Sequence, residues 1–148
     1  MTATRTAARG FVWLAAWLAL ASCGASSAAA ADKDYEQQVQ EGTRLHDAGD
    51  FKGAIAVYRK ILKKHPDDAR VLYEMSYSSL AAGDQKDAIE YAQKSQAASP
   101  AYAAECALMI GAAYDGMGQL KKGEEAFRSG LQAFPDNALL HFNLGVNL

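Results

Sequence analysis

The pattern of apolar and polar positions repeats along most of the chain. In each repeat a helical segment ends at a glycine followed by Asp or Gln, a second helical segment follows, and a proline closes the unit. The glycines lie 34 and 35 residues apart, and a repeat of this length indicates stacked two-helix units. The repeated positions are Gly49, Gly83 and Gly118, then Ala54, Ala88 and Gly123, then Pro66, Pro100 and Pro135.

Small residues occupy the positions where the two helices of a unit are expected to cross, and large residues occupy positions beside them. Each large side chain, if fully buried, contributes roughly 1.5–3 kcal/mol. This outweighs the cost of a glycine inside a helix, about 1 kcal/mol. The expected crossing residues of the first helices are Gly42, Ser76, Gly111 and Gly145, and the large residues include Tyr58, Leu72, Met75, Phe127 and Leu144.

The residues in the turns are of the types that end and begin helices. A glycine in the left-handed conformation ends the first helix, and an Asp directly after it, as in the first two units, can cap the second helix. We expect caps at Asp50 and Asp84, at Asp67, Ser99 and Asp136 for the helices after each proline, and a capping box at Asp34 and Gln37 that opens the array.

The second unit departs from the pattern. It carries Ser79, Ala92 and Ser95 where large residues are usual, so its second helix is expected to be the softest element. One extra residue near positions 101–104 predicts a longer turn between the second and third units.

With these positions the chain resembles the tetratricopeptide repeat (TPR) family from about Tyr35 to Leu148. The resemblance implies an all-α fold, a TPR α-solenoid of about three helix-turn-helix repeats plus one further A-type helix. The units run over about 35–68, 69–103 and 104–137, with a partial unit at 138–148, so that the TPR domain spans 34–148.

The resemblance also implies a concave groove lined by the first helix of each unit. The groove positions that carry apolar or aromatic residues are Tyr73, Tyr77, Leu108, Met109 and Phe142. We expect them to hold a segment of an envelope protein or peptide, although these rings could instead only pack neighbouring units. The carboxylate clamp of chaperone-cofactor members needs Lys and Asn where this chain has Val39 and Thr43.

The first residues form a predicted leader. Arg5 and Arg9 precede the uncharged apolar run 11–20, which has signal-peptide length. The following Leu-Ala-Ser-Cys resembles the lipobox of bacterial lipoproteins, which implies a signal peptide at 1–22, a lipid (palmitate-type acyl chains) on Cys23, and a flexible tether over 23–33. Cleavage after the alanines at 29–31, giving a secreted protein, and an uncleaved anchor are the alternatives.

A lipidated Cys23 would anchor the chain to a membrane without a spanning helix. Gly24 follows it, where Asp would suggest inner-membrane retention. The expected location is therefore the bacterial cell envelope, with the protein lipid-anchored to the outer membrane and facing the periplasm.

The charge balance and the remaining residues argue against other classes of protein. Without Arg5 and Arg9 the chain has 13 basic residues against 17 acidic ones, which argues against nucleic-acid binding. A basic run near positions 59–64 is interpreted as a solvated helix end, or else as a patch facing lipid headgroups or an acidic partner. Cys106 is expected to be a buried small hydrophobe rather than a reactive thiol.

No catalytic constellation, metal site or cofactor motif stands out in the sequence. His46, His65 and His141 lack metal-ligand spacing, so we interpret them as surface or packing residues. We therefore expect no enzyme activity, no cofactor and no metal.

The segment 138–148 matches the first helix of a fourth unit and carries no formal charge. Its apolar residues cannot all be buried against the third unit. Either the chain is truncated, or this face meets another subunit or a partner, for example in a homo-oligomer. The members of this apolar set are Leu140, Phe142, Leu144, Val146 and Leu148.

These features predict a non-catalytic adaptor: a lipid-anchored, periplasm-facing TPR lipoprotein that supports assembly of an envelope complex of the pilus or secretion type. The alternatives are a self-associating structural TPR protein and a fragment of a longer TPR protein.

Overall fold

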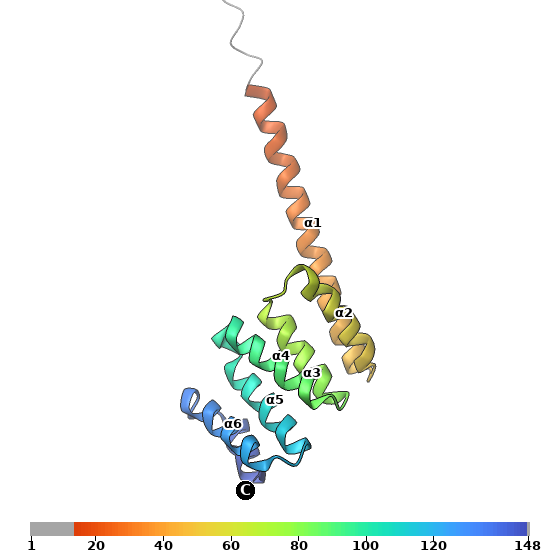
Figure 1. The fold of residues 1–148 in the computed structure, drawn as a ribbon. Coiled ribbons are helices and arrows are strands. Elements are labelled where there is room, and N and C mark those ends of the chain that lie inside the picture. Colours follow the sequence, from red (N-terminus) through yellow and green to blue (C-terminus); the bar gives the residue numbers. More distant parts are fainter. Residues whose placement is uncertain (1–13, 148) are drawn as a thin grey trace, which may run out of the picture. The chain divides into compact units, whose positions relative to one another are not determined.

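The structure is a computed structural model of the chain, and it describes the backbone of residues 14–147 and the side chains of residues 31–147. Those residues form seven α-helices and one short 3₁₀ helix, with no strand among them (Figure 1). The helices are α1 (Leu14–Asp47), α2 (Phe51–Lys64), α3 (Ala69–Ala81), α4 (Gln85–Ala98), η1 (Pro100–Tyr102), α5 (Ala103–Gly116), α6 (Leu120–Ala133) and α7 (Ala138–Asn147).

Contacts between Cα atoms divide the chain into two compact units, with the boundary between Gln37 and Gln38. The described part of the first unit is the beginning of α1. The second unit contains the last turns of α1 and the helices α2 to α7.

Helix α1 begins earlier than the sequence pattern suggests. The expected tether at 23–33, including Cys23, lies within this helix, and Asp34 therefore is not an N-cap. Alanine has the highest helix propensity of all residues, and the run 28–31 consists of alanine alone, so the helix continues through it. Arg5, Arg9 and positions 11–13 of the predicted leader lie outside the described residues.

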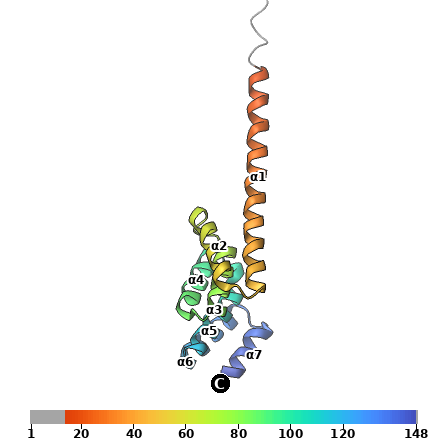
Figure 2. The ribbon, with the colours of Figure 1, turned by 90° about the vertical axis from the view of Figure 1, so that its right-hand side faces the viewer.

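Within the second unit, each helix from α2 to α7 packs against the next, and α5 also contacts both α3 and α7. Figure 2 shows α2, α4 and α6 on one side of the stack and α7 on the other. We call the last turns of α1 (from Gln38) with α3, α5 and α7 the A layer, and α2, α4 and α6 the B layer. This alternation is the helix-turn-helix stacking that the repeat predicted.

The glycine turns confirm the predicted helix ends. Gly49, Gly83 and Gly118 have φ values of 82°, 84° and 71°, in the left-handed region that glycine adopts without a steric cost. The backbone N–H of Gly53 donates a 2.9 Å hydrogen bond to Asp50 Oδ1, which confirms that cap. Asp84 stands at the N-cap of α4 but makes no side-chain cap bond.

Two of the predicted caps are wrong by one residue. The cap of α3 is Asp68 rather than Asp67, since Asp68 Oδ1 accepts from Val71 N at 3.1 Å. Before α7, Leu140 N donates to Asn137 Oδ1 at 3.0 Å, so Asn137 takes the place expected of Asp136.

The longer turn expected between the second and third repeat units is confirmed. It forms the 3₁₀ helix η1, with Pro100 at its first position. The Ser99 hydroxyl oxygen accepts a hydrogen bond from Ala101 N, as predicted for this cap.

Glycine and an aromatic ring meet at two of the helix crossings. A Cβ added to Gly42 would lie 2.4 Å from Tyr58 Cε1, and one added to Gly111 would lie 2.2 Å from Phe127 Cε1. Both rings are buried. These approaches require the glycines, because any side chain at these positions would overlap the ring.

The second repeat unit (69–103) packs with buried serines instead. Ser76, Ser78, Ser79 and Ser95 are buried. Ser76 Oγ donates to the Ala88 carbonyl at 2.8 Å, and Ser95 Oγ donates to the Ala69 carbonyl at 2.7 Å. These bonds satisfy hydroxyls that would otherwise be costly to bury.

Candidate partner-binding surface

Two tyrosines on α3 define the centre of the candidate surface. Tyr73 and Tyr77 are four residues apart on one helix, so they lie on the same face. Their rings are nearly parallel, with an interplanar angle of 7° and centroids 6.4 Å apart. Tyr77 is 42% exposed, and Tyr73 is half-buried.

Three further rings extend this pair into what we call the aromatic ladder. The His46 ring stacks on Tyr77 with centroids 4.4 Å apart, and the Tyr102 ring stacks on Tyr73 at 5.6 Å. Phe51 meets His46 edge-on at 5.2 Å. The ladder thus joins residues of α1, α2, α3 and η1 in one row of contacts.

Sequence reasoning placed Tyr73 and Tyr77 on this surface but missed the other three rings. The sequence predicts a surface or packing role for His46. In the structure its imidazole Nδ1 shares a 2.9 Å hydrogen bond with Ser78 Oγ. Tyr102 lies in the extra turn that follows Pro100. The extra residue there was the one sequence signal that could have drawn attention to this tyrosine.

Two carboxylates, Glu74 and Glu105, act on Tyr73 of the ladder. Burial raises the pKa of the half-buried Glu74 carboxyl, while the charges of Arg70 and His46 act to lower it and that of Asp47 to raise it. Burial also raises the pKa of Tyr73 to about 12, and the nearby charges of Glu74 and Glu105 act in the same direction.

Leu108 and Met109, the predicted groove residues of α5, are half-buried. Leu108 packs against the hydrophobic core of the third unit. Part of the side chain at this position therefore serves packing, as the alternative interpretation allowed. The core residues that it packs against are Ala104, Ala107, Phe127 and Leu140.

Helix α7 presents an apolar stripe. Leu139, Phe142 and Val146 are 61%, 68% and 71% exposed, and their spacing of three and four places them on one face. Leu140 is buried and Leu144 is half-buried. The expectation that this helix could not bury all of its apolar residues is confirmed for the described part, whereas Leu148 lies outside it.

The crossing position of α7 is open. A Cβ added to Gly145 would meet no heavy atom within 4 Å, in contrast to those of Gly42 and Gly111. The nearby end of α7 is held by Asn147, which donates to Asp115 Oδ1 and to the Leu120 carbonyl, the latter at 3.2 Å.

A separate hollow of about 640 Å³ lies in the B layer, between α2 and α4. Its apolar part includes Leu72 and Tyr91, and the basic residues Arg59, Lys63 and Lys94 stand at it together with Asp67. The Lys94 ammonium is paired with Glu90 at 2.6 Å. Part of the basic charge at this hollow is therefore already neutralised.

The side chains that the structure describes include one free cysteine. Cys106 is buried, as predicted, and burial raises the pKa of its thiol. No group of three or more His, Cys, Asp or Glu side chains there could hold a metal ion. No helix in this part of the chain is long and apolar enough to cross a membrane.

Comparisons with known proteins agree with this architecture. Residues 39–103 match the tetratricopeptide repeat family model. Comparison with curated protein sequences finds no match.

Solved structures share the fold. The Sgt2 TPR domain from Aspergillus fumigatus is 21% identical, with a TM-score of 0.70, over 77% of this chain and 76% of that one. The second TPR domain of human RPAP3, solved with the HSP70 peptide SGPTIEEVD, is 16% identical, with a TM-score of 0.69, over 76% and 97%. A MamA RS-1 double mutant is 32% identical, with a TM-score of 0.68, over 77% and 64%.

Modules of this kind are typically non-catalytic, and some of the similar structures carry bound peptides. The family model matches residues 39–103, and the structural neighbours share the fold: the described helices form a TPR α-solenoid.

Proposed function

We propose that the chain is a non-catalytic adaptor that binds a peptide segment of a partner protein on its A layer. The observation that carries this proposal is the pair of exposed apolar regions on that layer, Tyr77 in the aromatic ladder and the stripe on α7. Exposed patches of large apolar side chains mark interaction surfaces. Tyrosine suits this role because its ring offers a large contact area and a polar tip.

A displayed peptide library tests the proposal. Peptides selected on the full chain should lose about tenfold or more in affinity for Tyr77→Ala and for Phe142→Ala, because anchor residues contribute most of the binding energy of an interface. Leu120→Ala is the matched control, since Leu120 is also an exposed apolar residue, 52% exposed, but lies at the start of α6. Equal affinity of all variants, each folded by circular dichroism, would remove the A layer from the function.

The cellular setting is part of the proposal and is supported by the sequence. We infer that the chain carries a signal peptide over 1–22, a lipid on Cys23, and a place in the bacterial envelope, facing the periplasm, where it supports assembly of a complex. Metabolic labelling with palmitate in a Gram-negative host should mark the chain, and Cys23→Ser should abolish the label. An unlabelled protein whose first residue is 32 would instead indicate ordinary secretion.

Self-association is a second candidate, favoured by the exposed α7 stripe and the open position at Gly145. Sedimentation of the full chain in detergent-free buffer would show a concentration-dependent dimer that Phe142→Asp and Val146→Asp dissociate. A monomer at every concentration would exclude it.

A further inference from the structure

Helix α7 carries both halves of a helix crossing on its exposed surface, an open glycine position and a free aromatic ring. We propose that two copies of the chain pair through α7 about a two-fold axis, so that the Phe142 ring of each copy packs against Gly145 of the other. This inference rests on the proposed function in its self-association form, and it names the contact that would hold the two copies together.

The open position at Gly145 has two filled counterparts in the same molecule. Gly145 lies 34 residues after Gly111, which is one repeat length. At Gly111 and at Gly42, an aromatic ring of the following B-layer helix packs so closely that an added Cβ would lie 2.2 and 2.4 Å from it. An added Cβ at Gly145 would meet no heavy atom within 4 Å. The repeat geometry therefore indicates that an aromatic ring is the group that fits there.

A suitable ring is displayed on the same helix. Among the Phe and Tyr side chains of residues 31–147, that of Phe142 has the largest exposed fraction, 68%, ahead of Tyr77 and Phe134. Tyr77 already stacks on two rings of the aromatic ladder, and Phe134 lies just beyond the end of α6. Phe142 is three residues from Gly145, so the ring and the open position are neighbours on the surface of α7.

A two-fold axis satisfies both copies at once. Antiparallel pairing of two identical helices can place residue 142 of one beside residue 145 of the other, and the reverse, so this surface is complementary to itself. Leu139 and Val146 lie on the same exposed stripe and extend the contact. No Asp, Glu, Lys or Arg occurs in α7. Pairing therefore brings no like charges together, and charged residues are depleted at the centres of interfaces.

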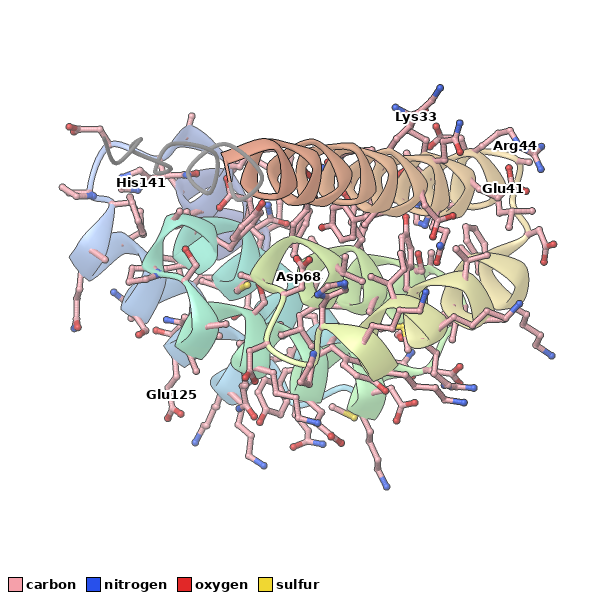
Figure 3. The ribbon with its side chains drawn as sticks, turned by 90° about the horizontal axis from the view of Figure 1, so that it is seen from above. Lys33, Glu41, Arg44, Asp68, Glu125 and His141 are labelled. Atoms are coloured by element: carbon pink, nitrogen blue, oxygen red, sulfur yellow. The ribbon has the colours of Figure 1, made fainter. Side chains whose placement is uncertain are left out.

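The side of α7 that faces the third repeat unit is already fixed. Leu140 is buried, and Asn147 near the end of the helix donates to the Leu120 carbonyl at 3.2 Å. His141, labelled in Figure 3, lies on α7, and its Nε2 donates to the Pro135 carbonyl at 2.7 Å. A helix that is fixed before binding loses little conformational entropy on binding. The pairing surface is therefore preformed in the single copy.

The length of α7 limits the strength of the pair. A helix of 10 residues is about 15 Å long, so contact through this helix alone falls below the size of a standard interface, roughly 1,200–2,000 Å². We expect a weak, reversible dimer with a dissociation constant of about 10 µM to 1 mM. A peptide that binds Phe142 competes with this pairing, so peptide affinities are measured below that range of concentration.

Sedimentation equilibrium of the full chain, from about 1 µM to about 1 mM, tests the pairing. Gly145→Ala adds a Cβ that meets no atom of its own copy but occupies the place of the other copy's ring. It should weaken the dimer about tenfold for each of the two identical contacts, and about a hundredfold in all. Its thermal unfolding at monomer concentration should not fall below that of wild type, because alanine favours the helix.

Phe142→Ala should weaken the dimer by a similar factor, since it removes both rings. Leu120→Ala is the matched control, because Leu120 is an exposed apolar residue on α6 rather than α7, and it should leave the dimer unchanged. Residues 1–31 are common to all variants, so any association through them does not differ between the samples.

A mixture of the two variants tests the contact itself. In a mixed pair, Phe142 of the Gly145→Ala copy still meets Gly145 of the Phe142→Ala copy, so one of the two contacts is intact. The mixture should therefore associate about tenfold more tightly than either variant alone. A purely structural effect of either substitution would give no such recovery.

The results that overturn the inference also separate it from the proposed function. If the mixture associates no more tightly than the variants, or if Gly145→Ala pairs as wild type does while Phe142→Asp dissociates the dimer, the chain self-associates without the ring packing on Gly145. If wild type stays a monomer up to about 1 mM, self-association fails together with the inference. The adaptor function is judged separately, by the peptide affinity of Tyr77→Ala.

Discussion

The first and third repeats close their helix crossings in one way, and the second repeat in another. In the first and third, a glycine lets an aromatic ring, Tyr58 or Phe127, approach the backbone of the A-layer helix. In the second, Ser76 replaces the glycine, Ala92 replaces the ring, and a hydroxyl donates to a helix carbonyl. The two changes compensate each other, because a serine leaves too little space for a ring and an alanine leaves space that a serine can use.

Which residue fits at a repeat position therefore depends on the residue that faces it across the crossing. Taken alone, Ala92 and Ser76 look like weak substitutes for the residues of the other units. Taken together they are buried, and the Ser76 hydroxyl is hydrogen-bonded. We therefore expect substitutions at the three crossings to change the free energy of unfolding by different amounts.

The largest effect should come from removing a ring. Phe127→Ala deletes a buried aromatic side chain beside Gly111 and should lower the free energy of unfolding by about 3–5 kcal/mol. Urea denaturation followed by far-ultraviolet circular dichroism measures this loss. A loss below about 1 kcal/mol would show that the third crossing is not tightly packed. Leu120→Ala, at an exposed apolar site, is the control.

An intermediate effect should come from placing a ring in the second repeat. Ala92→Phe alone should overpack the crossing and destabilise the chain by about 1–3 kcal/mol. Adding Ser76→Gly supplies the space that the other units use, so the double variant should be more stable than Ala92→Phe alone, with a coupling energy of about 0.5–3 kcal/mol. Additive effects in the double-mutant cycle would contradict the idea that the two positions compensate each other.

The smallest effect should come from the helix caps of the first two repeats. Asp50→Ala removes the hydrogen bond from Gly53 N and should cost about 1 kcal/mol. Asp84→Ala removes no side-chain cap bond and should cost only a few tenths of a kcal/mol, from the lost charge near the helix start. The same denaturation measurement on both variants decides the point, and equal losses would mean that Asp84 caps α4 in solution.

The elements of this fold could be predicted because their signals are local. Glycine at a positive φ and proline after a helix are fixed by the chemistry of single residues, and Gly49, Gly83 and Gly118 behave accordingly. The caps were predicted only to within one residue. Asp67 and Asp68 are both able to cap, as are Asp136 and Asn137, so composition could not choose between neighbours.

The candidate surface was predicted only in part, for a different reason. Tyr73 and Tyr77 share one helix, so their common face follows from spacing. Their stacking on His46 and Tyr102 joins separate elements, and it depends on how α1 and η1 pack against α3. Neighbour relations of this kind are absent from any single stretch of sequence.

The open space beside Gly145 also makes the chain a practical scaffold for engineering. A grafted hairpin patterned on α6, with an aromatic residue in register, could dock against Gly145 as Phe127 docks against Gly111. Such an extension would cover the apolar side of α7 and lengthen the solenoid by a designed module, without altering the surface around Tyr77.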